Sequence, residues 1–314
     1  MRLKVAAARL LLQLAGLLPL AVLHALGAAA GRLLGAFGTR EAKVACRNVE
    51  LAFPALDRVA QRALYRRTLA ETGKSTFELP KFWGATPERA LALIRDVRGR
   101  EHVDAALAAG RGVLVAAPHL GAWELLNLYL STLAPLTILY KAPRSAALEA
   151  VLTATRGVLG AEAVRAEASG VRLLFRRLRE GRLVGILPDQ RPKGGEGEDA
   201  PFFGRPARTM TLLSRLAEKT GAPVVLAFAE RLAHGRGFRI HFAPAEPEVA
   251  SADRVAAVAA LNRGIERLVA LAPAQYQWTY KRYSFRLPDS GIDPIYGKLG
   301  RRRRRARVAD EDEA

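Results

Sequence analysis

The sequence has little cysteine and none of the common cofactor motifs. Cys46 is the single cysteine among 314 residues, which excludes an intrachain disulfide and a cysteine-only zinc site and fits a reducing, cytosolic setting. The five histidines are scattered singly, so no metal site is expected. Gly194, Gly195 and Gly197 lack the lysine and serine or threonine that end a phosphate loop, and no GxSxG sequence is present. A P-loop enzyme, a zinc enzyme and a serine hydrolase are therefore not expected.

Charge is missing from one long stretch near the N-terminus. Residues 10–31 contain no formally charged residue, and basic residues flank them on both sides. This length is just enough to span a bilayer, although Pro19, His24 and an alanine- and glycine-rich second half weaken the pattern. We predict a hydrophobic membrane-anchor helix within residues 1–35 that spans the membrane or lies in its interface, with a cleaved signal peptide as the alternative.

Acidic residues are too few to balance the basic ones. The chain has 49 lysines and arginines against 30 aspartates and glutamates, a net charge of +19, which favours anionic partners such as nucleic acid, anionic lipid or an acidic protein. Residues 291–314 are expected to form a charged, disordered tail; its six arginines and four acidic residues from position 301 onward contribute only +2. No nucleic-acid partner is expected, because no recognised binding motif or stacking platform is present.

The hydrophobic period changes along the chain. Residues 40–84 show helical spacing, and from residue 111 short β-like runs alternate with helical patterns. The expected strands are 113–116, 136–140, 183–187, 223–229 and 238–242, and the expected helices are 122–133, 171–179, 209–220 and 254–272. This alternation predicts an α/β domain over residues 36–290, with a mostly parallel central sheet flanked by helices.

His119 follows the first of these strands, in a loop bounded by Pro118 and Gly121. Residues five apart on one helix point about 140° away from each other. His119 and Glu124 can therefore meet only if His119 ends the loop and Glu124 reaches back from the first helical turns. A carboxylate on one imidazole nitrogen would fix the tautomer and leave the other nitrogen as a general base. The alternative is an ordinary loop histidine followed by a helix-start acid.

Six blocks of the sequence together resemble one known family. The blocks are Arg47–Pro54, His119–Glu124, Gly185–Gln190, Phe202–Thr209, Gly221–Val225 and Gln275–Arg282. In this order they resemble the late (lauroyl or myristoyl) acyltransferases of lipid A biosynthesis, within the glycerolipid-acyltransferase-like superfamily that carries a His-x4-Asp/Glu dyad. The resemblance extends from the hydrophobic N-terminus to about residue 285 and implies a glycerol-phosphate-acyltransferase-like fold.

The resemblance implies a reaction and a site. A fatty acyl chain would pass from acyl carrier protein to a hydroxyl of a lipid A precursor, with no further cofactor, His119 acting as general base and Glu124 orienting it. Arg156 falls where the family places a functional arginine, although Arg144 competes for that assignment. Asp189 matches the aspartate of the family's Pro-Asp motif and is expected in the substrate-binding site, where it would orient an arginine or a loop backbone. A strand-end turn cap is its alternative role.

Two further residues and the location complete the expectations. Tyr140 and Lys141 lie at a predicted strand end and are expected to contact the acceptor. A positive surface suits an acidic acyl carrier protein, a phosphorylated acceptor and anionic inner-membrane lipids. The resemblance implies the bacterial inner membrane, with the catalytic domain on its cytoplasmic side. The competing hypothesis is acylation of another membrane glycolipid or of a lysophospholipid, from acyl carrier protein or acyl-CoA.

Overall fold

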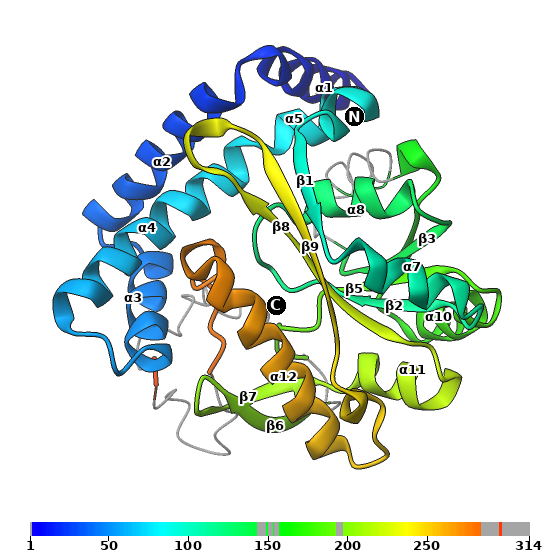
Figure 1. The fold of residues 1–314 in the computed structure, drawn as a ribbon. Coiled ribbons are helices and arrows are strands. Elements are labelled where there is room, and N and C mark those ends of the chain that lie inside the picture. The colour runs from blue at the N-terminus through cyan, green and yellow to red at the C-terminus, as the bar shows by residue number, and fades with distance from the viewer. Residues whose placement is uncertain are drawn as a thin grey trace, which may run out of the picture.

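A twisted seven-stranded sheet forms the centre of the molecule (Figure 1). The structure is a computed structural model that describes residues 2–142, 149, 153, 157–192, 197–283 and 295–296. The strands are β1 (Ile94–Arg98), β2 (Val113–Ala116), β3 (Leu136–Tyr140), β4 (Glu162–Arg165), β5 (Leu183–Ile186), β8 (Val224–Arg231) and β9 (Phe238–Pro244). Their order in the sheet is β1-β9-β8-β2-β5-β3-β4.

Most neighbouring strands run parallel, which confirms the predicted sheet. β2 pairs in parallel with both β5 and β8, and β3 pairs in parallel with β4 and β5. β9 is the exception, because it runs antiparallel to β8. Only a short turn joins these two strands, with His234 and Gly235 in the left-handed region at φ 60° and 66°, and a connection this short can only reverse the chain.

Helices cover both faces of the sheet. They are α1 (Arg2–Leu17), α2 (Leu20–Ala36), α3 (Arg40–Ala52), α4 (Arg58–Phe77), α5 (Leu79–Trp83), α6 (Pro87–Leu91), α7 (Arg100–Ala108), α8 (Trp123–Ser131), α10 (Ala168–Arg179), α11 (Leu212–Thr220) and α12 (Arg254–Leu271). Leu114 and Ala116 of β2 point into a core shared with α3, α4, α10, α11 and α12. Val113 and Val115 point into the opposite core, shared with α7 and α8. Strand side chains alternate between faces, so β2 is buried on both sides.

The segment between β5 and α11 contains a β-hairpin, part of which occupies the predicted start of a helix. β6 (Gly197–Phe202) and β7 (Arg205–Met210) pair antiparallel through a two-residue turn at Phe203 and Gly204. Both turn residues have positive φ, 49° and 70°, as a type I′ turn requires. The helix expected from residue 209 therefore begins only at Leu212, because the residues before it pair with β6.

The N-terminal segment is two helices, which corrects the expected single anchor helix. α1 and α2 meet at an angle of 110°, because Pro19 at the N-cap of α2 lacks the backbone N–H that would continue α1. In the described part of the chain no one helix has the length and hydropathy of a membrane span; the bent pair of residues 10–17 and 20–36 passes that test only when joined.

Helix α2 packs closely against α4 through glycines. A Cβ atom added at Gly31 would lie 1.9 Å from the carbonyl oxygen of Leu69, and one added at Gly73 would lie 1.8 Å from that of Gly27. Only glycine allows two helix backbones to approach this closely. Figure 1 shows the resulting pair along one edge of the molecule.

Within the expected C-terminal tail, Tyr296 is described and buried, and its hydroxyl accepts a hydrogen bond from the Tyr283 backbone.

Candidate active site

The His119 loop, residues 117–122, leaves the carboxyl end of the central strand β2 and leads into α8. Its backbone is bound on several sides. Gly121 N–H donates to the Gln275 carbonyl at 3.2 Å, and Gln277 N–H donates to the His119 carbonyl at 2.9 Å. Gly121 has φ 64°, and a Cβ atom there would lie 1.9 Å from the Ala229 carbonyl oxygen. Only glycine fits at this point, and its close contact with β8 fixes the position of the loop backbone.

Asp189 is the carboxylate that binds His119. It follows β5, the neighbour of β2, and is 2% exposed. One carboxylate oxygen accepts from His119 Nδ1 at 2.8 Å and the other accepts from the His119 backbone N–H at 3.0 Å. Burial alone would raise the pKa of Asp189, but the charge and hydrogen bonds of His119, with the charge of Arg282, lower it below its usual value. Asp189 is therefore an ionised acceptor that holds the proton of His119 on Nδ1.

The other ring nitrogen of His119 faces a glutamine. The Gln190 side-chain amide donates to Nε2 at 3.1 Å and to Gln277 Oε1 at 3.0 Å. The indole of Trp123 packs edge-on to the imidazole with ring centroids 5.4 Å apart. The His119 side chain is 17% exposed, so the imidazole is mostly but not completely buried.

The structure brings His119 together with Asp189, whereas sequence reasoning expected Glu124 to orient it. Glu124 lies in the first turn of α8, as expected, and is buried. Both ring nitrogens of His119, however, have partners other than Glu124. Among the residues that the structure describes, the carboxylate hydrogen-bonded to the imidazole is therefore Asp189. The physical reason is the strand order: β5 lies beside β2, so Asp189 reaches both the ring and the backbone of the same residue.

Of the remaining predicted site residues, the structure describes Tyr140 and Lys141. Arg156 and its competitor Arg144 lie outside the described residues. Tyr140 ends β3, and its hydroxyl donates to Glu149 at 2.7 Å. Lys141 follows it and is exposed. Tyr140 and Lys141 lie at the carboxyl ends of the parallel strands, as His119 does. Because β5 separates β3 from β2, they are two strand spacings from His119, about 10 Å.

Sequence reasoning missed the role of Arg282. This arginine is 1% exposed and donates to the Arg208 carbonyl at 2.9 Å and to Thr209 Oγ1 at 2.6 Å. Its guanidinium lies 4.8 Å from the centre of the Phe202 ring. Arg282 therefore joins the last sequence block to the β6–β7 hairpin. The sequence signal for Arg282 was its place in the block Gln275–Arg282. Its burial is seen only in the structure, and a buried arginine is rare without a structural or functional reason.

The first sequence block reaches the site through Asn48. The Asn48 side-chain amide donates to the carbonyls of Trp278 and Tyr280 at 2.6 and 2.7 Å. Tyr280 in turn accepts a hydrogen bond from the backbone of Arg191, next to Gln190. These bonds join the first block to the last one, more than two hundred residues later, and Gln277 of that last block binds the His119 carbonyl. Among the described residues, no three histidine, cysteine, aspartate or glutamate side chains are grouped to hold a metal ion.

Comparison with known proteins identifies relatives over most of the chain. A family model described as bacterial lipid A biosynthesis acyltransferase matches residues 4–284. The lipid A biosynthesis lauroyltransferase of Escherichia coli (strain K12) is 26% identical over 270 residues, 86% of this chain and 87% of that protein. The palmitoleoyltransferase of the same organism is 28% identical over 274 residues, again 86% and 87% of the two chains. A phosphatidylinositol mannoside acyltransferase of Mycobacterium tuberculosis (strain ATCC 25618 / H37Rv) is 29% identical over 205 residues, 64% of each chain.

Proposed function

The chain belongs to the bacterial lipid A biosynthesis acyltransferase family, and we propose that it transfers a fatty acyl chain from acyl carrier protein to a hydroxyl of a lipid A precursor. The observation that carries this proposal is the double contact of Asp189 with the ring and backbone of His119. It leaves Nε2 as a base in a site built from the family's sequence blocks. The relatives that act in lipid A biosynthesis cover nearly all of this chain.

His119 performs the proton transfers in this mechanism. Its Nε2 accepts the proton of the acceptor hydroxyl while that oxygen attacks the thioester carbonyl of the donor. The tetrahedral intermediate then collapses, the carbon–sulfur bond breaks, and the leaving thiolate takes the proton back from Nε2. The products are an ester and a free carrier thiol. General base catalysis of this kind contributes about 10²–10⁴-fold to the rate.

Asp189 and Gln190 support the base in different ways. The Asp189 carboxylate stabilises the positive charge that His119 carries while it holds the proton. The Gln190 amide, 3.1 Å from Nε2, occupies the position that the acceptor hydroxyl must take, so the hydroxyl replaces it on binding. Glu124 stays a proposed member of the site, as a buried carboxylate next to Trp123, which packs on the imidazole.

The proposed location is the cytoplasmic face of the inner membrane. Helices α1 and α2 expose a set of large apolar side chains, here called the α1–α2 apolar face. Its members are Leu10, Leu11, Leu14, Leu17, Val22, Leu26 and Leu33. An apolar face of this kind on a strongly basic protein suits the surface of an anionic bilayer. We expect Leu14→Glu/Leu17→Glu to reduce sedimentation with anionic vesicles, while Leu271→Glu on α12, which changes an equally exposed leucine, leaves it unchanged.

The test of the reaction supplies purified protein with acyl carrier protein loaded with a fatty acyl chain and a tetra-acylated lipid A precursor. Mass spectrometry should show one added acyl chain with the wild type and none with His119→Ala. Transfer to a lysophospholipid, with none to the lipid A precursor, would refute the proposal.

The second candidate is acylation of another membrane glycolipid. It is favoured by the 29% identity to a phosphatidylinositol mannoside acyltransferase. Adding that glycolipid as an acceptor in the same assay separates the two functions.

A further inference from the structure

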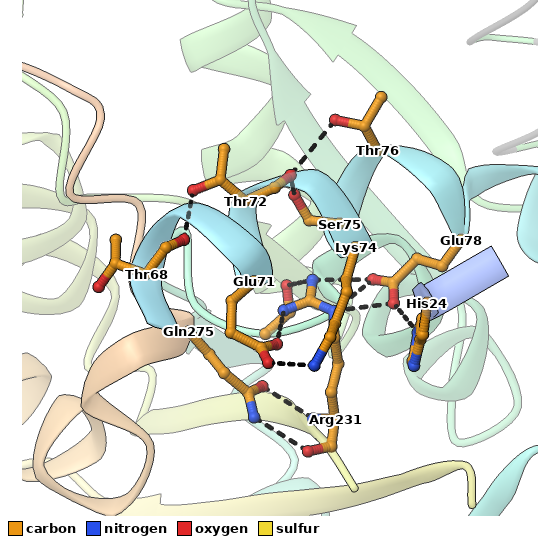
Figure 2. Close-up of polar contacts among 11 residues, drawn as sticks. His24, Thr68, Glu71, Thr72, Lys74, Ser75, Thr76, Glu78, Arg231 and Gln275 are labelled. Carbon is orange, nitrogen blue, oxygen red and sulfur yellow. Dashed lines mark hydrogen bonds and ion pairs between the residues drawn. The ribbon is translucent and has the colours of Figure 1, made fainter. Parts of the chain in front are cut away.

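A buried arginine links the N-terminal helices to the His119 loop. Arg231 ends β8, and its side chain is 2% exposed. Its Nη2 donates to the Gly121 carbonyl at 2.7 Å. Its Nε donates to the Glu78 carboxylate at 2.8 Å, and Figure 2 shows these two side chains facing each other. Gly121 is two residues beyond His119, so the guanidinium bonds directly to the loop that carries the proposed base.

Gln275 connects the backbone of Arg231 to the N–H of the same glycine. Arg231 N–H donates to Gln275 Oε1 at 2.8 Å, and the Gln275 amide donates to the Arg231 carbonyl at 2.9 Å, the pair of contacts drawn in Figure 2. The Gln275 carbonyl accepts from Gly121 N–H. Both polar groups of Gly121 are therefore bound to Arg231 or to its direct partner, and the peptide cannot rotate without breaking these contacts.

Glu78 supplies the counter-charge and extends the link to α2. This carboxylate, 1% exposed at the C-cap of α4, binds both Arg231 and His24 Nε2 of α2, the latter at 2.9 Å. Burial alone would raise the pKa of Glu78, but the Arg231 charge and the His24 hydrogen bond lower it. Figure 2 shows His24, Glu78 and Arg231 in a row, with Glu71 and Lys74 beside them.

Stability alone does not account for this arrangement. Replacing a buried ion pair by apolar side chains of similar volume is often neutral or stabilising. A guanidinium, however, has five N–H donors in a rigid fork and can hold a carboxylate and a carbonyl at once. At this position the carbonyl belongs to the His119 loop, where a misplacement of about 1 Å can cost about 10²-fold in rate.

We propose that Arg231 is a positioning residue for His119, with Glu78 and His24 coupling the His119 loop to helix α2. The proposal rests on the function proposed above, in which His119 is the base. Arg231 does not touch the reacting groups; it fixes Gly121 and thereby the distance between His119 and Asp189. Helix α2 also carries part of the α1–α2 apolar face, so the helix proposed to lie on the membrane is bonded through three side chains to the proposed catalytic loop.

The test uses the full chain with Glu78→Met/Arg231→Met, which removes both charges of the buried pair together. Glu71, which Arg231 also approaches at 3.7 Å, keeps Lys74 as its partner at 2.6 Å. A second variant, Arg231→Lys, keeps the charge but lacks the rigid fork. Arg239→Lys is the matched control, because Arg239 also binds a carboxylate, Asp96 at 2.7 Å, but lies at the β1–β9 edge. We expect kcat to fall about 10–100-fold in the double variant and less in Arg231→Lys, with KM for the acyl donor unchanged. Arg239→Lys should match the wild type.

A second measurement needs no substrate. The ¹⁵N chemical shifts of the His119 ring distinguish the tautomer with its proton on Nδ1, and they should change in the double variant but not in Arg239→Lys. Wild-type kcat and wild-type ring shifts in a folded double variant would overturn the proposal, as would an activity loss equal to the loss of folded protein. If His119→Ala keeps activity, the proposed function fails instead, while the ring shifts still decide whether Arg231 positions His119.

Discussion

Replacing Asp189 by asparagine tests the central contact of the site. The wild-type carboxylate accepts two hydrogen bonds from His119, at 2.8 and 3.0 Å, and is 2% exposed. Asparagine keeps the shape but removes the charge, and an amide N–H facing Nδ1 would move the imidazole proton to Nε2. The base would then have its lone pair on the wrong nitrogen.

The expected loss is large because two effects add. A hydrogen bond to a charged group contributes about 1.5–3 kcal/mol, and the reversed tautomer adds a cost that raises the total to about 4 kcal/mol. At 1.36 kcal/mol for each tenfold, kcat should fall about 10³-fold. The assay is transfer of one acyl chain to the lipid A precursor, followed by mass spectrometry under single-turnover conditions, with the melting temperature as a check on folding.

Glu124→Gln is the matched comparison. It makes the same chemical change in the buried carboxylate of Glu124, whereas the ring nitrogens of His119 are hydrogen-bonded to Asp189 and Gln190. We expect a smaller loss of kcat than in Asp189→Asn. The assignment of the orienting role to Asp189 would be refuted if Asp189→Asn stayed within about tenfold of the wild type while Glu124→Gln fell to the level of His119→Ala.

Three further predictions concern stability. Gly73→Ala should lower the free energy of unfolding by about 1–3 kcal/mol, measured by thermal denaturation, because its Cβ would lie 1.8 Å from a backbone oxygen; Gly157→Ala, with no atom within 4 Å of its Cβ, should not. Asn48→Ala should cost about 2–3 kcal/mol in a denaturant titration, since two backbone carbonyls lose their donor. The pKa values of Asp189 and Glu78 are lowered in the folded protein. Their stabilisation is therefore complete above the unfolded values of about 4 and lost as pH falls through the folded ones; melting temperatures that rise below pH 4 would contradict this.

Strong apolar runs made much of the sheet predictable. β2 and β3 have the predicted bounds, and β5, β8 and β9 differ from prediction by only one or two residues at their ends. β1 and β4 were missed because both are edge strands rich in charged residues, so their sequences show no continuous apolar run. The hairpin of β6 and β7 was missed because its turn places a phenylalanine at positive φ, where sequence rules expect glycine, asparagine or aspartate.

The amino-acid sequence by itself determined the α/β class, the loop that carries His119, and the arrival of Asp189 at a strand end, because apolar period and the glycine and proline of the loop are local properties. Only the tertiary structure decided which carboxylate meets His119. That choice depends on β5 lying beside β2, an adjacency between strands about seventy residues apart. The link from His24 through Glu78 and Arg231 to Gly121 joins residues 54 to 153 positions apart in the chain. Only long-range packing brings these groups together, and the low dielectric of the interior then strengthens their hydrogen bonds.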